Sequence, residues 1–306
     1  MITLKQMIDD YLTYCEEQKK LSAKSTKAYA IDLEQFKQQV TTENIPAKTD
    51  ISIYIVYLHK NYMPRTVKRK IASIRAFYNF LEFEEIICDN PIKKIKTKFQ
   101  EPQVLPRTIS LSAIENILDV VYQEMKQAQT AYAFCSALRN IAIIELLFAT
   151  GIRVSELCSL NIENIDLQNG IIRIIGKGRK ERILQLGNQE VISILRRYVE
   201  EGITNIHKTG CLFVNRLSSR ISEQSVRFLI KRLCVKIDIG HKITPHMFRH
   251  SFATLLLEED VDIRYIQHML GHSSILTTQI YTRVAMEKQR QILTIKHPRN
   301  RITVKV

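Results

Sequence analysis

The sequence predicts a mainly α-helical protein of two domains, the second of which holds a small antiparallel β-sheet. A length of 306 residues is sufficient for two separate hydrophobic cores. Apolar residues recur at helical spacing through most of the chain, and a basic segment with prolines but without this spacing divides them. Residues 162–186, by contrast, alternate and break in the manner of short strands, with Asn169–Gly170 as a turn signal.

Residues 1–97 are expected to form the first domain as a bundle of helices. The apolar stripe that starts at Leu4 predicts a helix ending near Lys20. The fourth expected helix begins at Pro64, because proline is well tolerated at the first helical position. The four helices are expected to begin at Leu4, at Ser25, at Ile51 and at Pro64.

The fourth helix is strongly basic, with no acidic residue on it before Glu82. A basic stretch on a helix is often only its solvated face. Because no acid on the helix compensates these charges, contact with DNA phosphates is the favoured interpretation. A second strip of contact is expected around the start of the second helix. The candidate DNA-binding residues are Lys24, Tyr29, Arg65, Lys68, Arg69 and Arg75.

Residues 98–107 are expected to link the two domains. This segment contains Pro102 and Pro106, follows a run of lysines, and shows no helical periodicity. A linker with this charge can follow DNA phosphates while it joins two lobes around a duplex. The first domain would comprise residues 1–97 and the second residues 108–306.

The second domain is expected to open with a helix capped by Ser110 or Ser112, followed by a buried helix over Leu138–Thr150. Gly151 is a typical residue to end that helix. Arg153 follows at once and needs an anionic partner if it turns inward, because burying it unpaired is costly. Glu156 or a phosphate would supply that partner.

The alternating stretch predicts two paired strands, Ile171–Ile175 and Arg182–Leu186. The turn between them would place Lys177 at the tip of a hairpin. Lysines are common in turns, so Lys177 by itself does not indicate a function. Further helices are expected at Glu190–Glu200, Ser222–Ile237, Thr244–Glu259, Ile263–Leu270 and Ile275–Val284.

The helix that begins at Thr244–Pro245 carries the clearest candidate site. His246 and Arg249 are three residues apart, so both project from its first turn, near the positive end of the helix dipole. A polyanion would bind well there, although lone residues of these types near helix starts are usually solvated or capping groups. His246 and His250 have the spacing of two zinc ligands, but Met247 stands where the glutamate base of that motif would be. No carboxylate ligand follows closely, so the zinc interpretation is weak.

The formal net charge of +14 favours a polyanionic partner. Nucleic acid is preferred over an anionic membrane surface, because no lipidation signal or basic amphipathic membrane helix is evident. The six cysteines are scattered without a CxxC pair, which predicts neither a metal cluster nor a disulfide framework. We find no apolar run of membrane-spanning length and no signal-peptide core, so a cytoplasmic protein is expected.

Five short motifs occur in the order ATGIRVSEL, GKGRK, HMFRH, LGHSS and IYTRV. This series resembles the tyrosine recombinases, the phage-integrase and Xer-type family, over essentially the whole chain. The resemblance implies a helical, SAM-like core-binding domain and a catalytic domain that together form a C-shaped DNA clamp, in the simple form without an additional arm-binding domain. The implied catalytic residues are Arg153, Lys177, His246, Arg249, His272 and Tyr281.

The resemblance also implies the reaction. Tyr281 would attack a phosphodiester to form a 3′-phosphotyrosyl bond, with His246 as proton acceptor and Lys177 as the acid for the leaving 5′-oxygen. Arginines and histidines would stabilise the developing charge, so no metal or other cofactor is expected. The expected partners are double-stranded DNA with inverted-repeat half-sites and a homo-tetramer on two sites, or a hetero-tetramer with a second recombinase, with a possible accessory protein.

Two other functions are considered. A type IB topoisomerase-like enzyme would relax DNA by the same chemistry as a monomer, and a sequence-specific DNA-binding protein would use the fold without cutting. The biological task would be integration, excision, inversion or chromosome-dimer resolution, and the sequence does not distinguish among them. The resemblance also implies that residues 294–306 act as a tail that docks on a neighbouring protomer, with a frayed terminus as the common alternative.

Overall fold

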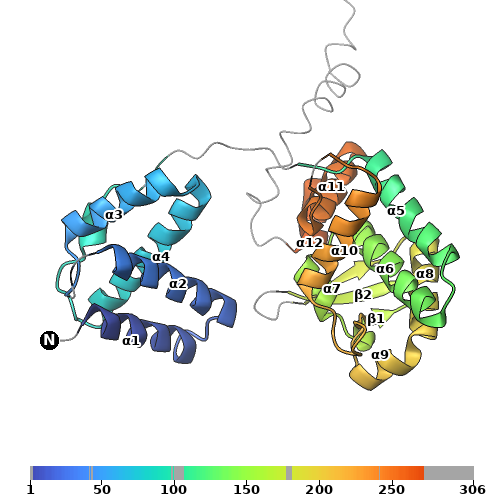
Figure 1. The fold of residues 1–306 in the computed structure, drawn as a ribbon, viewed down its shortest axis with the longest axis horizontal. Helices are drawn as coiled ribbons and strands as arrows, with labels where there is room; N and C mark the ends of the chain where they lie inside the picture. The colour runs from blue at the N-terminus through green and yellow to red at the C-terminus, as the bar shows by residue number, and fades with distance from the viewer. Residues whose placement is uncertain are drawn as a thin grey trace, which may run out of the picture. The chain divides into compact units, whose positions relative to one another are not determined.

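The computed structural model describes residues 3–40, 42, 44–97, 99, 107–176, 181–240 and 242–271. The chain divides into two compact units between Gln103 and Val104 (Figure 1). This division falls inside the segment 98–107, which the sequence analysis interprets as a linker. Each unit has its own cluster of buried apolar side chains.

The first unit is the expected helical bundle. Ser22 caps the second helix, since its Oγ accepts a hydrogen bond from the Ser25 N–H at 3.3 Å. That helix therefore begins earlier than the sequence pattern suggests. The elements are α1 (Leu4–Glu17), α2 (Ala23–Gln39), α3 (Lys48–Asn61), α4 (Pro64–Phe83) and a 3-10 turn, η1 (Pro91–Lys94).

A buried ion pair joins α2 to α4 inside this unit. Asp32 is 1% exposed, and its carboxylate accepts hydrogen bonds from Lys70 Nζ at 3.1 Å and from Ser73 Oγ at 2.8 Å. Arg69 also donates to Asp32. The charges of α4 are thus partly compensated by an acid on another helix, which the sequence of α4 itself does not indicate. Lys70 is buried and does not belong to the exposed basic face.

The second unit is also mainly helical and contains the expected sheet. Its three strands pair antiparallel in the order β1-β2-β3, with Ile172 opposite Leu184. Gly170, in the predicted turn before β2, has φ +63°, a left-handed conformation that glycine adopts readily. The strands are β1 (Ile165–Asp166), β2 (Ile171–Ile175) and β3 (Glu181–Gln185).

The helices of the second unit confirm most of the expected ones, and the seven-residue α9 is an addition. The predicted helix over Ile275–Val284 lies outside the described residues. The elements are α5 (Leu111–Lys126), α6 (Ala131–Thr150), α7 (Val154–Ser159), the 3-10 turn η2 (Ile162–Asn164), α8 (Gln189–Glu201), α9 (Ile203–Thr209), α10 (Glu223–Lys236), α11 (Pro245–Glu258) and α12 (Ile263–Leu270).

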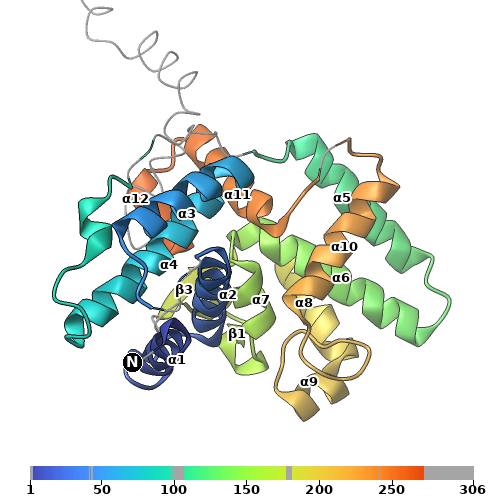
Figure 2. The ribbon, with the colours of Figure 1, turned by 60° about the vertical axis from the view of Figure 1, so that its left-hand side comes forward.

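Helix α6 is the central element of the second unit, packed against α5, α8 and α11 (Figure 2). Among the described residues it is also the one helix long and apolar enough to cross a membrane, with a mean hydropathy of 1.5 over an 18-residue window. The expectation that no run of this length exists is therefore wrong. Burial of 56% of this window in the core accounts for its composition.

Gly151 ends α6 where α11 passes close by. Its φ of +59° is left-handed, as expected for a helix-ending glycine. A Cβ atom at this position would lie 2.6 Å from Cδ1 of Phe252 on α11. The absence of a side chain at Gly151 therefore lets the end of α6 approach the helix that carries His246 and Arg249.

Candidate active site

Arg153 lies directly after the end of α6, at the N-cap position of α7. Its Nη1 donates a hydrogen bond to Glu156 Oε1 at 2.9 Å, and its backbone N–H donates to Oε2, also at 2.9 Å. Glu156 is one of the two partners that the sequence analysis expects. The Arg153 side chain remains 36% exposed, so its guanidinium also faces solvent.

Arg182 on β3 is a member of the site that the sequence analysis misses. Its Nη1 and Nη2 donate to the two carboxylate oxygens of Glu156 at 3.0 and 2.7 Å. Burial raises the pKa of the Glu156 carboxyl, but the hydrogen bonds from Arg182 and from the Arg153 backbone outweigh it and hold that pKa below its usual value. Glu156 is therefore ionised at neutral pH and shared by two guanidinium groups.

Arg249 is 4% exposed and joins the ends of two helices. Its Nη1 donates to the carbonyl of Gly151 at 2.8 Å, and its Nη2 donates to the carbonyl of Leu270 at 2.6 Å. Carbonyls at helix C-termini carry partial negative charge, so a guanidinium is well placed there. Since Gly151 is two residues before Arg153, these bonds bring both predicted arginines to the end of α6.

The first turn of α11 forms as the sequence suggests, with Thr244 at the N-cap and Pro245 at the first helical position. The Thr244 side chain makes no capping hydrogen bond. His246 is exposed and His250 is half-buried. Burial lowers the pKa of the His250 imidazole, and the nearby charges of His246 and Arg249 lower it further, so His250 is mostly neutral at pH 7.

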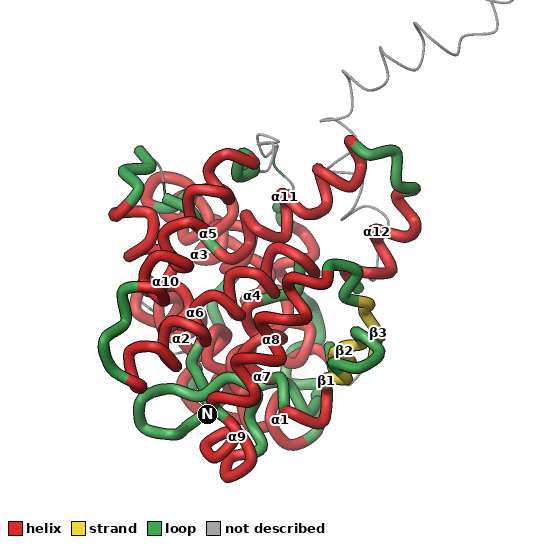
Figure 3. Tube along the Cα trace, turned by 90° about the vertical axis from the view of Figure 1, so that its right-hand side faces the viewer, coloured by secondary structure: helices red, strands yellow, loops and turns green. Residues whose placement is uncertain are grey.

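Three of the six predicted catalytic residues lie outside the described part of the chain: Lys177, His272 and Tyr281. The described segments next to two of them lie close together, because β3 and α12 pack side by side (Figure 3). Lys177 precedes β3, and His272 follows Gly271, which ends α12 with φ +64°. A Cβ at Gly271 would lie 3.1 Å from Cδ of Arg182.

The exposed basic face of α4 consists of residues with helical spacing, namely Arg65, Lys68, Arg69 and Arg75. Arg75 donates a hydrogen bond to Thr97 Oγ1. Lys24 is exposed on α2. Tyr29, in contrast, is half-buried with its ring 5.8 Å from that of Tyr11, so it contributes to the core of the first unit.

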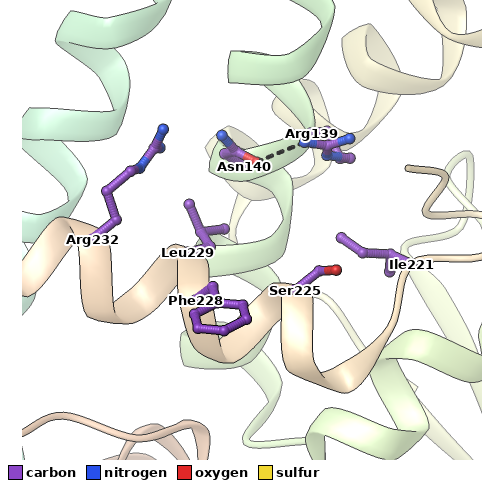
Figure 4. A pocket seen from close by; sticks show the side chains of 7 residues that line it. All are labelled: Arg139, Asn140, Ile221, Ser225, Phe228, Leu229 and Arg232. Carbon is purple, nitrogen blue, oxygen red and sulfur yellow. Dashed lines mark hydrogen bonds between the residues drawn. The ribbon is translucent and has the colours of Figure 1, made fainter. Parts of the chain in front are cut away.

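A pocket of about 220 Å³ lies between α6 and α10 in the second unit (Figure 4). None of the predicted catalytic residues that the structure describes lines it, and its arginine side chains already have protein partners. Arg139, for example, donates to the carbonyl of Val214 at 2.9 Å. Among the described residues, no group of three or more His, Cys, Asp or Glu side chains is arranged to hold a metal ion, so the zinc interpretation gains no support there.

Two protein-family models match this chain. The model described as "Phage integrase family" matches residues 117–288, and the model described as "Phage integrase, N-terminal SAM-like domain" matches residues 8–85. The first match covers all six predicted catalytic residues, including the three outside the described segments. The second match covers α2, α3 and α4, with the greater part of α1.

Relatives with curated names align over nearly the full length. A "Tyrosine recombinase" of Agathobacter rectalis is 49% identical over 302 residues, which is 98% of each chain. A "Tyrosine recombinase XerD" of Listeria innocua is 34% identical and covers 97% of this chain and 100% of its own. Among solved structures, the XerH site-specific recombinase bound to palindromic difH substrate shares the fold, with a TM-score of 0.74, 23% identity, and coverage of 94% of this chain and 84% of that one.

Proposed function

We propose a reaction for this protein from one premise: the chain belongs to the phage integrase family of tyrosine recombinases. It acts as a site-specific recombinase that cleaves DNA strands, holds them through a 3′-phosphotyrosyl bond and rejoins them to new partners. The observation that supports this most strongly is the convergence of Arg153 and Arg249 at the end of α6, where Arg249 bonds to the Gly151 carbonyl at 2.8 Å.

The two arginines stabilise the charge that develops on the scissile phosphate. A guanidinium offers paired N–H donors to non-bridging oxygens, and a phosphodiester under attack gathers negative charge on those oxygens. Fixed donors cost no reorganisation during the reaction, which makes such stabilisation a large contribution to the rate. The carbonyls that hold Arg249 and the carboxylate that holds Arg153 fix these donors in advance.

The proton transfers are assigned to residues carried over from the family. The Tyr281 hydroxyl attacks the phosphorus and gives its proton to His246, while Lys177 protonates the leaving 5′-oxygen and His272 adds a hydrogen bond to the phosphate. The phosphotyrosyl bond conserves the energy of the phosphodiester, so the religation step runs without a nucleotide or a metal ion.

The substrate is double-stranded DNA with inverted-repeat half-sites, bound by a tetramer across two sites. The net charge of +14 and the basic face of α4 support a DNA partner. A second recombinase in a hetero-tetramer, or an accessory protein, is compatible with the same assembly. We assign the protein to the cytoplasm and its task to integration, excision, inversion or chromosome-dimer resolution.

The Tyr281→Phe variant tests the assignment. With a nicked suicide substrate in EDTA, the parent protein should form a covalent protein–DNA band, and the variant should form none while binding the site almost normally, because only the nucleophilic oxygen is lost. Tyr265→Phe is the matched control, since Tyr265 is an exposed tyrosine on α12, and it should cleave like the parent. A covalent band from Tyr281→Phe, or a parent that binds without cutting, would contradict the proposal.

A further inference from the structure

We propose that Arg182 is a positioning residue of the recombination reaction, which holds Glu156 so that Arg153 keeps its guanidinium turned toward the phosphate. This inference rests on the proposed function, because it takes Arg153 as a phosphate ligand. It adds a residue that is neither one of the six carried over from the family nor a DNA contact. The grounds are the donors of Arg182, its burial and the segments that it joins.

Every nitrogen of the Arg182 side chain donates a hydrogen bond to the protein. Nη1 and Nη2 bond the two oxygens of Glu156 at 3.0 and 2.7 Å, and Nε bonds the carbonyl of Met269 at 2.9 Å. The Arg182 side chain is 9% exposed, whereas that of Arg153 is 36% exposed. The two arginines on Glu156 therefore differ in role: Arg182 is directed inward, and Arg153 is available at the surface.

The shared carboxylate explains how Arg182 acts on Arg153. Each oxygen of Glu156 accepts one bond from Arg182 and one from Arg153, whose Nη1 bonds Oε1 and whose backbone N–H bonds Oε2. If Arg182 were removed, the bonds that remain to this buried carboxylate would be the two from Arg153. An ionised buried carboxylate with fewer donors is costly, so Glu156 would draw the Arg153 guanidinium inward, away from the substrate.

Arg182 also holds the end of α12. The carbonyls of Met269 and Leu270 accept bonds from Arg182 and Arg249 respectively, just before Gly271 and the predicted His272. Arg182 lies on β3, the strand that follows the predicted Lys177, and it pairs there with Ile174. One guanidinium thereby connects the hairpin, the start of α7 and the end of α12, three segments that are distant in the sequence.

Substitution of Arg182 should slow the chemical step and leave DNA binding intact. For Arg182→Met we expect single-turnover cleavage of a suicide substrate, at saturating protein, to fall roughly 10- to 100-fold, the scale of a misplaced catalytic group. Arg182→Lys keeps the charge but not the fork, and should show a smaller loss. Arg173→Met is the matched control, because Arg173 is an exposed arginine on the adjacent strand, and it should cleave at the parental rate.

A double-mutant cycle on the cleavage rate distinguishes positioning from general loss of structure. Because Arg182 acts largely through Glu156, Arg182→Met should slow cleavage by a smaller factor in the Glu156→Gln background than in the parent. Mobility-shift titration and thermal unfolding of each variant accompany the rates. If Arg182→Met does not fold, the Arg182→Lys variant decides the question by its cleavage rate relative to its site affinity.

Two results would overturn the inference: parental cleavage rates in both Arg182 variants, or additive losses in the cycle with site affinity falling in parallel. Failure of the proposed function gives a different result, since the parent itself would then form no covalent adduct through Tyr281. If the parent forms this adduct and the Arg182 variants cleave at the parental rate, the role of Arg182 is contradicted and the proposed function stands.

Discussion

The carboxyl group of Glu145 is buried on α6, where it accepts a hydrogen bond from the hydroxyl of Tyr122 at 2.9 Å. Burial raises the pKa of this carboxyl, the Tyr122 bond opposes the rise, and the negative charge of Glu190 adds to it. A raised pKa in the folded state means that the folded chain holds this proton more tightly than the unfolded chain does. The contribution of Glu145 to stability is therefore complete at low pH and is lost as the pH rises through the folded-state pKa.

The Glu145→Gln variant should consequently be more stable than the parent at pH 8, by roughly 1 kcal/mol, because the amide is never charged and still accepts the Tyr122 bond. The advantage should shrink as the pH is lowered toward the ordinary pKa of a glutamate. Urea unfolding at a series of pH values measures both effects. Glu115→Gln, at an exposed position on α5, serves as the control. A Glu145→Gln protein that loses stability at pH 8 would show that the carboxylate is favourable in the fold.

At the residue scale, local sequence patterns indicate arginines that lie in short motifs. They do not indicate an arginine whose hydrogen-bond partners are distant in the sequence. Arg153 and Arg249 follow from their short motifs. The partners of Arg182 are 26 and 87 residues away in the sequence, so no local spacing indicates that the side chain of this strand residue is bonded inside the fold. A signal was available for Lys70: it stands three residues after Val67 and four before Ile74, within the apolar stripe of its helix.

At the scale of elements, α4 presents cations to solvent on one face and apolar side chains to the core on the other. Replacing Lys68, Arg69 and Arg75 with glutamine should weaken binding to all DNA sequences alike. The slope of log K against the logarithm of the salt concentration should become less steep by about 2 to 3, because three phosphate contacts are lost. We expect the smallest share from Arg69, because it already pairs with Asp32.

The control for α4 removes the same charge at three exposed residues in and just after α1, namely Lys5, Lys19 and Lys20. Mobility-shift titrations between low and physiological salt compare the two triple variants with the parent. An equal effect of both sets would indicate that overall charge matters and not the α4 face. A parental salt slope in the α4 variant would exclude this face as the contact surface.

Element boundaries were predictable where a strong local signal exists. Pro64, the turn at Asn169–Gly170 and Gly151 each occupy the expected position. The pairing of β2 with β3 was predictable from their alternation together with the glycine-containing segment between them in the sequence. The short helix α9 was missed because its seven residues are too few to establish a period.

At the scale of the whole molecule, the two units have separate cores, and the described residues do not include the segment 294–306. This segment is basic, contains Ile295, Ile302 and Val304, and is too short to fold alone. Exchange of the segment between protomers is the role that the family suggests for it, and in a closed ring of four protomers it would couple the active sites.

Deletion of residues 294–306 should therefore preserve binding to a single site and impair synapsis and recombination of two sites. The matched variant keeps the length and charge of the segment but replaces Ile295, Ile302 and Val304 with serine, and it should show the same defect if apolar docking is responsible. Native mass measurement of two-site complexes gives the number of protomers, and product analysis gives the recombination rate. Because binding to one site needs no neighbour, a truncated protein that still assembles four protomers and recombines at the parental rate would exclude the tail as the coupling element.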